Sequence, residues 1–190
     1  MRSRPILPFM AHASSPKTVD DYFALGEDRL TELIEGEFVV SAAPNWPHQR
    51  ASFRLALLLE VQLRRLKLGK VNLPVDVELS RTTVVHPDVV YLSNATMKRI
   101  KGHLFGPPDL AVEFLSSSNR SNDLKRKMKL YLEYGVPQYW IGDPEARTIR
   151  VLENGGRARI EKGTFKPGDV IRPSGMPGVT VEVSEVFEDE

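Results

Sequence analysis

The clearest pattern in the chain is a pair of short apolar runs, rich in β-branched residues, that each contain one carboxylate. Residues 84–92 carry Asp88, and residues 109–115 carry Glu113. Runs of this length and composition are typical of buried strands. Burying a carboxylate is costly unless a cation, a proton or hydrogen bonds compensate it. We therefore expect these two carboxylates, in consecutive strands, to share a cation.

Upstream of these runs, the pattern predicts a short helix followed by a hairpin. Thr18 is the expected N-cap of the helix, and Glu35 and Gly36 supply the tight turn of a hairpin over residues 28–43. Alternation along the first strand places Glu32 on the same face as apolar neighbours. The pattern is compatible both with another buried carboxylate there and with an exposed hairpin charge.

The longest helical pattern spans residues 48–68 and follows a loop over residues 44–47. Gly69 is expected to end this helix. Residues 73–80 alternate as a strand and should form a hairpin with residues 84–92. The apolar positions of the helix recur with helical period and predict one buried arc, made of Phe53, Leu55, Leu57, Leu58, Val61 and Leu63.

The second half of the chain alternates strands, turns and one further helix. The expected elements are a helical turn within residues 94–106, a helix over residues 122–134, a strand at 138–143, an antiparallel hairpin over 148–162, and a strand or short helix at 179–187. This order predicts an α/β (α+β) fold with a mixed sheet flanked by helices and a C-terminal antiparallel meander. We expect one domain over residues 17–190, after a flexible leader at residues 1–16.

Helical geometry separates the four cations of the predicted helix at residues 122–134. At about 100° per residue, Lys127 falls inside the arc of apolar and aromatic side chains, whereas Lys125, Arg126 and Lys129 lie on the opposite side. Lys127 is therefore expected to point towards the sheet, where the two strand carboxylates are its natural partners. The alternative is that Lys127 extends past its neighbours into solvent. The other three cations face water or a phosphate.

Composition narrows the class of protein. With 190 residues, 41% hydrophobic and 27% charged, the chain has the composition of an ordinary globular domain. The absence of cysteine excludes disulfides, thiolate metal sites and cysteine nucleophiles. No apolar run approaches the roughly 18 residues of a membrane span. The first residues imitate a signal peptide, but their apolar stretch is short and is broken by Pro8, which favours a cytoplasmic protein starting at Met1 or Met10.

The charge distribution is compatible with an anionic partner. The formal net charge is +1, yet residues 182–190 contain five acidic residues and no basic one, so the rest of the chain is modestly basic. Asp, Glu and Lys side chains that converge suit metal-dependent phosphodiester hydrolysis, with Mg²⁺ or Mn²⁺ favoured by hard oxygen ligands. Such a metal lowers the pKa of a bound water, and a lysine beside it orients that water or stabilises the developing anion.

Two of the four histidines are candidates to support such a site. His86 lies two residues before Asp88, on the same face of the predicted strand. His48, near the start of the long helix, is a candidate to contact a phosphate or the active site, or else has a structural role at the helix end. Trp46 and Trp140 are interpreted as packing residues.

Three segments in order carry a resemblance to a known family. HPDVVYL at residues 86–92, AVEFLSSSN at 111–119 and DLKRKMKLYLEYGVPQYWIGDPE at 123–145 resemble the Uma-type (Uma-two) family of the PD-(D/E)XK nuclease superfamily. The resemblance covers residues 18–153 and implies a restriction-endonuclease-like fold. Its most specific part is the ordered set that ends in KxxxYxxxGVPxYW.

The resemblance also implies roles for individual residues. Asp88 and Glu113 would be the metal-binding carboxylates, Glu32 an additional acidic ligand or a supporting residue, and the backbone carbonyl of Phe114 a further ligand. The usual lysine of the superfamily lies two positions after the strand glutamate, where this chain has a leucine. In this branch the lysine has moved to the following helix, which selects Lys127.

We therefore predict a Mg²⁺- or Mn²⁺-dependent endonuclease that acts on DNA. Asp88, Glu113 and Lys127 form the predicted catalytic set, while Lys125, Arg126 and Lys129 are candidates to contact backbone phosphates. The alternative is a catalytically silent nucleic-acid-binding or dimeric scaffold protein with the same fold. Hydrolysis of a small phosphodiester is a third hypothesis. A homodimer is suggested by family analogy and by the apolar, β-rich C-terminal third of the chain.

Overall fold

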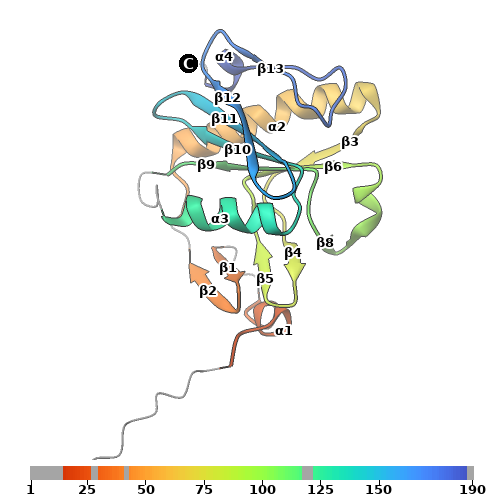
Figure 1. The fold of residues 1–190 in the computed structure, drawn as a ribbon, viewed down its shortest axis with the longest axis vertical. Coiled ribbons are helices and arrows are strands. Elements are labelled where there is room, and N and C mark those ends of the chain that lie inside the picture. The colour runs from red at the N-terminus through yellow and green to blue at the C-terminus, as the bar shows by residue number, and fades with distance from the viewer. Residues whose placement is uncertain (1–14, 27–29, 41–42, 117–121, 188–190) are drawn as a thin grey trace, which may run out of the picture.

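Two six-stranded sheets packed with helices form the framework of the protein (Figure 1). The computed structural model describes residues 15–26, 30–40, 43–116 and 122–187. The predicted leader therefore lies almost wholly outside the described residues, as does the alternative start at Met10. Within the described ranges, no helix combines the length and apolarity needed to cross a membrane.

The first sheet, here called the central sheet, contains one parallel pair of strands. Its order is β12-β11-β10-β9-β6-β3. The neighbours β9 and β10 are parallel, whereas the other neighbours are antiparallel. The bounds are β3 (Gly69–Asn72), β6 (Val89–Ser93), β9 (Leu110–Phe114), β10 (Gln138–Asp143), β11 (Thr148–Asn154) and β12 (Arg159–Phe165).

The second sheet, here called the side sheet, is built from shorter strands in the order β2-β1-β5-β4-β8-β7. Its strands are β1 (Thr31–Ile34), β2 (Glu37–Val40), β4 (Val77–Ser80), β5 (Thr83–Val85), β7 (Ile100–Lys101) and β8 (His103–Phe105). A separate two-stranded ladder joins β13 (Val170–Ile171) to β14 (Val181–Glu182) near the C-terminus.

The two long helices cover opposite faces of the central sheet (Figure 1). One core packs α2 (Trp46–Leu66) and the C-terminal segment against alternate residues of β6 and β9, such as Val89 and Val112. The other core packs α3 (Asn122–Glu133) and the side sheet against the intervening residues, such as Val90 and Ala111. The short helices are α1 (Val19–Phe23), η1 (Thr96–Arg99) and α4 (Val183–Val186). Helix α3 therefore lies where both sheets can contribute side chains to its inner face.

Several predicted elements are confirmed. Thr18 caps α1 in a capping box with Asp21, the hairpin at Glu35 and Gly36 joins β1 to β2, and the C-terminal antiparallel hairpin pairs β11 with β12. The last segment, predicted as a strand or a short helix, contains both β14 and α4. The mixed sheet flanked by helices is likewise confirmed.

The predicted strand over residues 84–92 is wrong as a single element. It is divided into β5 and β6, which belong to different sheets. The division falls at residues 86–88, where Pro87 lacks the N–H that a continued ladder would need. Asp88 and His86 therefore lie between two strands rather than inside one.

The predicted ends of the long helix also need correction. Helix α2 begins at Trp46 rather than at His48, because Asn45 caps it and a proline is tolerated in the first turn. It ends before Gly69, at Lys67, which adopts a left-handed conformation with φ 56°. Gly69 instead starts β3, a strand that was not predicted, and β7 and β8 were missed as well.

Candidate active site

Asp88 is held at the edge of the central sheet by two donors from different elements. Its Oδ2 accepts a hydrogen bond of 2.7 Å from the backbone N–H of Phe114, and its Oδ1 lies 3.0 Å from His48 Nε2. Val89 is paired with Val112 in the antiparallel register of β6 and β9. Extending this register by one residue brings Asp88 opposite Glu113.

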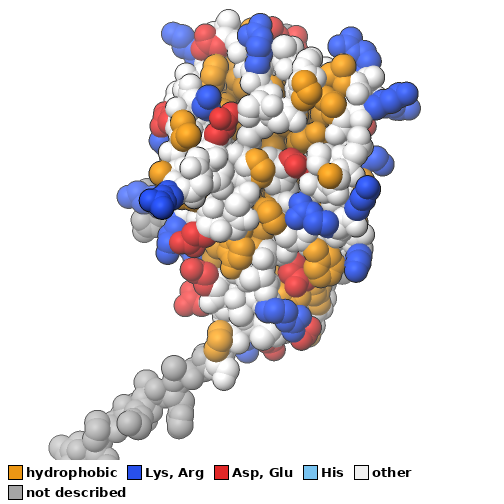
Figure 2. All heavy atoms as spheres, turned by 45° about the vertical axis from the view of Figure 1, so that its right-hand side comes forward, with side chains coloured by type: hydrophobic (Ala, Val, Ile, Leu, Met, Phe, Trp, Pro, Cys, Tyr) orange, Lys and Arg blue, Asp and Glu red, His pale blue; other side chains and the backbone are white. Residues whose placement is uncertain are grey.

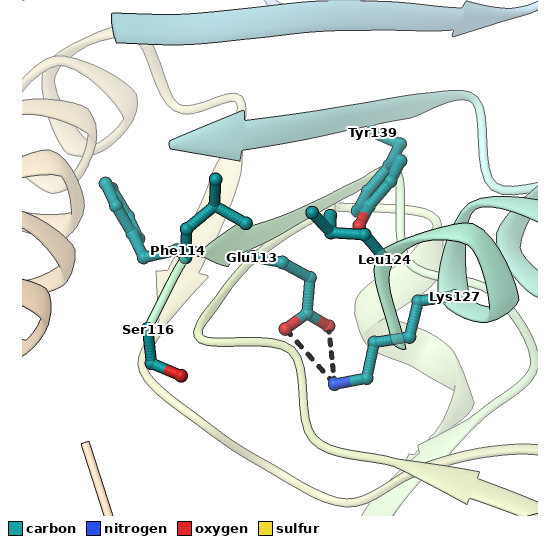
Figure 3. Close-up of a pocket in the computed structure, with 7 residues that line it drawn as sticks. Glu113, Phe114, Ser116, Leu124, Lys127 and Tyr139 are labelled. Atoms are coloured by element: carbon teal, nitrogen blue, oxygen red, sulfur yellow. Dashed lines mark hydrogen bonds and ion pairs between the residues drawn. The ribbon is translucent and has the colours of Figure 1, made fainter. Parts of the chain in front are cut away.

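Glu113 and Lys127 form a buried ion pair below the end of β9 (Figure 3). Lys127 Nζ lies 3.1 Å from Glu113 Oε1 and 3.2 Å from Oε2. The same ammonium lies 3.1 Å from Glu32 Oε2, so it bridges two carboxylates. Tyr131, one helical turn after Lys127, donates its hydroxyl to Glu113 Oε1 at 2.7 Å. Three elements, β1, β9 and α3, therefore meet at one lysine.

The position of Lys127 follows from the phase of α3. Lys127 is 6% exposed and Leu130 is 3% exposed, whereas Lys125 and Lys129 are exposed. The predicted inward orientation of Lys127 is thereby confirmed, and the alternative in which it reaches solvent is wrong. The apolar residues of the same face, including Leu130, pack into the core beneath the sheet and fix the helix rotation.

The charged form of Glu113 is disfavoured in this cluster. Burial raises the pKa of Glu113, Lys127 opposes that rise, and the nearby Asp88 and Glu32 carboxylates add to it, so that the pKa lies at about 8. Burial also raises the pKa of Tyr131 well above its ordinary value. Burial is thus the main cause of the raised pKa of Glu113, and the two neighbouring carboxylates add to it.

Glu32 is buried, at 3% exposure, which decides between its two predicted states. Its Oε1 accepts a hydrogen bond of 2.8 Å from the backbone N–H of His86. The imidazole of His86 points elsewhere, with Nε2 2.7 Å from Asp76 Oδ1 and 2.7 Å from the Tyr22 hydroxyl. His86 therefore supports the cluster through its backbone, while its side chain joins a separate network.

His48 is the histidine that contacts a site carboxylate through its side chain. It is 7% exposed in the first turn of α2, and its Nδ1 has no hydrogen-bond partner among the described residues. The Asn45 cap fixes its backbone N–H at 3.0 Å from Asn45 Oδ1. His48 therefore lies at the helix end, as one of its two predicted roles requires, and from there its Nε2 also contacts Asp88 of the candidate site.

The three outer cations of α3 differ in their surroundings. Arg126 donates to the carbonyl of Ile34 at 3.0 Å and to Glu37 Oε2 at 3.3 Å, so it ties α3 to the β1–β2 hairpin. Lys129 pairs loosely with Glu133 at 3.6 Å. On the face shown in Figure 2, Lys and Arg side chains are interspersed with Asp and Glu rather than gathered in one band. The predicted phosphate contacts of Lys125, Arg126 and Lys129 stay predictions.

A small pocket opens beside the ion pair (Figure 3). Its volume is about 40 Å³, enough for a water molecule, and its lining includes Glu113, Phe114, Leu115, Ser116, Leu124, Lys127 and Tyr139. Among the described residues, no three His, Asp or Glu side chains converge as a ready metal cage. The donors present nevertheless fit Mg²⁺ or Mn²⁺ chemically, because the Asp88 and Glu113 carboxylates supply the hard oxygen ligands that these ions prefer. The predicted role of the Phe114 carbonyl stays a prediction.

Sequence reasoning missed two parts of this site. Tyr131, the tyrosine of the KxxxYxxxGVPxYW motif, was given no role at the site, although its spacing of four residues from Lys127 places both on one face. No sequence pattern predicted the contact between Glu32 and Lys127. Glu32 lies on β1 of the side sheet and Lys127 on α3, and only the tertiary structure brings these two elements together. Trp46, interpreted as a packing residue, is 74% exposed, whereas Trp140 is fully buried as expected.

Comparisons with known proteins agree on one family and one fold. A family model described as "Uma2: Putative restriction endonuclease" matches residues 19–184. The crystal structure of a "putative nuclease belonging to DUF820" from Anabaena variabilis ATCC 29413 superposes with a TM-score of 0.76 at 18% identity, covering 90% of this chain and 98% of that chain. At this identity the superposition shows a shared fold. The DrdV–DNA complex superposes with a TM-score of only 0.40 at 18% identity, over 74% of this chain and 11% of that chain, and carries no argument. A search of curated proteins gave no match.

Proposed function

The chain belongs to the Uma2 family, whose printed description is "Putative restriction endonuclease", and we propose that it is a Mg²⁺- or Mn²⁺-dependent endonuclease acting on DNA. The family supports a nuclease, and the metal requirement and the DNA substrate are the parts proposed here. The observation that carries the proposal is the buried cluster in which Lys127 Nζ bridges Glu113 and Glu32 at 3.1 Å each, next to Asp88.

The proposed metal ligands are Asp88 and Glu113. Their carboxylates come opposite one another in the extended register of β6 and β9, and after burial the Asp88 and Glu32 charges contribute to the raised pKa of Glu113. When bound, the metal would lower the pKa of a water and neutralise charge on the phosphorus-centred transition state. The Phe114 carbonyl is proposed as a further ligand, beside the pocket that its residue lines.

Lys127 is proposed to position the attacking water and to stabilise the developing oxyanion. Glu32 and Glu113 hold its ammonium between them, so that the side chain needs no reorganisation during the reaction. Tyr131 fixes Glu113 Oε1 by its 2.7 Å hydrogen bond. His48 fixes the Asp88 carboxylate in the same way. Each reactive group is thus supported by a neighbour that need not touch the substrate.

The test is cleavage of plasmid and oligonucleotide DNA with and without Mg²⁺ or Mn²⁺. Asp88→Asn and Glu113→Gln keep the shape of each side chain and are expected to lower cleavage at least 100-fold. The matched control is Glu161→Gln, an exposed carboxylate on β12. Cleavage by Asp88→Asn at the wild-type rate, after removal of contaminating nucleases, would contradict the proposal.

A scaffold without turnover is the competing function, and one observation favours it. Both oxygens of Asp88 and both oxygens of Glu113 already have donors within the chain. Calorimetric titration separates the two functions, because the nuclease requires Mg²⁺ or Mn²⁺ binding that Glu113→Gln weakens. A protein that binds DNA but shows no heat of metal binding would be the scaffold.

A further inference from the structure

The outward face of α2 is apolar along most of its length. Between Arg50 and Leu63, the exposed residues of this helix are Phe53, Leu57 and Val61, at 48%, 51% and 63% exposure. The sequence pattern predicts these three as part of a buried arc, and for them that prediction is wrong. A surface helix normally turns polar side chains towards water, so three successive turns whose exposed residues are all apolar point to a contact.

Trp46 extends this apolar face to the start of the helix. At about 100° per residue it falls within one arc of about 80° together with Phe53, Leu57 and Val61, and it is 74% exposed. These four residues are called the α2 stripe. At 1.5 Å per residue the α2 stripe is about 22 Å long. The half-buried Arg50 falls in the same arc, so the stripe is apolar at its exposed positions, and exposed apolar residues gathered in this way mark interaction sites.

The polar neighbours of the α2 stripe are engaged within the chain. Arg54 Nε donates to the carbonyl of Glu185 at 2.7 Å, and Gln62 Nε2 donates to the carbonyl of Thr180 at 2.7 Å. Both bonds fasten the C-terminal segment along one side of α2. One side of α2 is therefore bonded to the C-terminal segment, and the α2 stripe beside it faces outward.

We propose that the α2 stripe is a homodimer interface, on which a second copy of this chain packs its own α2 in the antiparallel direction. Trp46 and Arg64 lie at the same helical phase near opposite ends of the helix. Antiparallel pairing centred at the level of Leu55 sets each Trp46 beside Arg64 of the second copy, a cation over an indole ring. It also brings Arg50 towards Glu60 of the second copy. Parallel pairing would instead set Arg64 beside Arg64.

The composition of the face favours a second copy over a nucleic acid. A polyanion needs lysines and arginines against its phosphates, and the centre of the α2 stripe has none exposed. An apolar centre with charged residues towards the ends is typical of homodimer interfaces, and a two-fold axis needs a surface that complements itself. This interface does not depend on the proposed nuclease activity.

The first test is the mass of the full chain in solution by light scattering across a dilution series. The expected mass is twice that of the 21.4 kDa chain, and Leu57→Glu, which sets two carboxylates near the axis, should return it to the monomer. Ile160→Glu, at a 53% exposed apolar residue of β12, is the matched control and should stay dimeric. Because Leu57 is exposed, its variant should keep the far-UV circular dichroism spectrum of the control variant, which shows that the monomer remains folded.

The second test uses the absence of native cysteine to read the orientation. Two Leu57→Cys copies would lie about 6 Å apart along the axis, and two Trp46→Cys copies about 27 Å apart. A short bis-maleimide should therefore join Leu57→Cys copies to each other, and Trp46→Cys copies only to Arg64→Cys copies. Three results overturn the proposal: a wild-type monomer at every concentration, a dimer that survives Leu57→Glu, or Trp46→Cys copies joined to each other. The proposal is also overturned if the chain is a monomer in which iodide quenches the fluorescence of Trp46 only after residues 1–14 are deleted.

Discussion

At the scale of single residues, the site is governed by one ammonium among several carboxylates. Lys127 holds Glu32 and Glu113 at hydrogen-bonding distance in a buried position. Buried pairs of this kind add little net stability when complete, yet they are costly to break, because the remaining partner is left buried with its charge. The same property that makes Lys127 a candidate for catalysis therefore makes it a structural residue as well.

Lys127→Met is expected to lower the free energy of unfolding by about 3–5 kcal/mol, because it leaves Glu32 and Glu113 buried without a cation. The loss should be smaller at pH 6 than at pH 8, since protonation of Glu113 removes part of the repulsion. Urea unfolding at the two pH values measures it. Lys125→Met, at an exposed position of the same helix, should change stability by less than about 0.5 kcal/mol.

The raised pKa of Glu113 predicts how stability depends on pH. Its folded-state pKa is about 8, above the ordinary value of 4.5, so the folded protein keeps a proton that the unfolded chain loses between these values. The stability contributed by Glu113 is then fully present below about pH 4.5 and is lost as pH rises towards 8. Glu113→Gln has no such loss.

The measurement compares wild type and Glu113→Gln by urea unfolding from pH 5 to pH 9 in the presence of a chelator. The difference in unfolding free energy should move in favour of the variant as pH rises, by a few kcal/mol in total, and then level off above about pH 8. A difference that stays constant over this range would show that Glu113 is ionised throughout.

At the scale of elements, the start of α2 links helix stability to the geometry of the site. Asn45 caps α2 by accepting the backbone N–H of His48, and the His48 side chain holds Asp88. The cap residue Asn45 is thus linked through His48 to Asp88, a proposed metal ligand. The break between β5 and β6 also contributes to the geometry of the site, because it leaves Asp88 outside the ladder of paired strand residues.

Asn45→Ala is expected to lower the free energy of unfolding by about 1 kcal/mol and also to weaken Mn²⁺ binding, because His48 then holds Asp88 less firmly. Thr18→Ala is the matched variant, since it removes the side-chain cap of α1. Calorimetry and thermal unfolding of both variants test this. Equal Mn²⁺ affinity in the two variants would mean that the α2 cap does not act on the site.

At the scale of the whole molecule, the proposed binding to DNA would rely on local rather than global charge. The net charge is only +1, and basic and acidic side chains are mixed on the face shown in Figure 2. Arg126 is already engaged with the β1–β2 hairpin. Lys125 and Lys129, exposed on α3 close to the proposed catalytic lysine, are therefore the cations best placed to reach a phosphate.

Lys125→Gln and Lys129→Gln are each expected to weaken DNA binding to a similar extent for all sequences. Each should also reduce the slope of log K against log salt by about 1, because one phosphate contact releases roughly one counterion. Fluorescence anisotropy with a labelled duplex in Ca²⁺, at several salt concentrations, measures both quantities. Arg126→Gln should instead lower the melting temperature, since it removes the contact between α3 and the hairpin.

The sequence alone determined those features that follow from local periodicity. The 3.6-residue repeat of α3 put Lys127 on its inner face, and the apolar strand at residues 109–115 put Glu113 in the core; both are observed. The ordered motifs likewise pointed to the family that the comparisons identify. Such features depend on neighbours within one or two turns, which the sequence shows directly.

Only the tertiary structure decided which distant residues meet. A strand pattern does not tell which sheet a strand joins, so residues 84–92 gave no sign that they divide between two sheets, or that the break frees Asp88 for His48. Glu32 was equally compatible with solvent and core until β1 brought it to Lys127. An apolar helix face is the same in sequence whether it meets the core or a partner, and packing alone left the α2 stripe exposed.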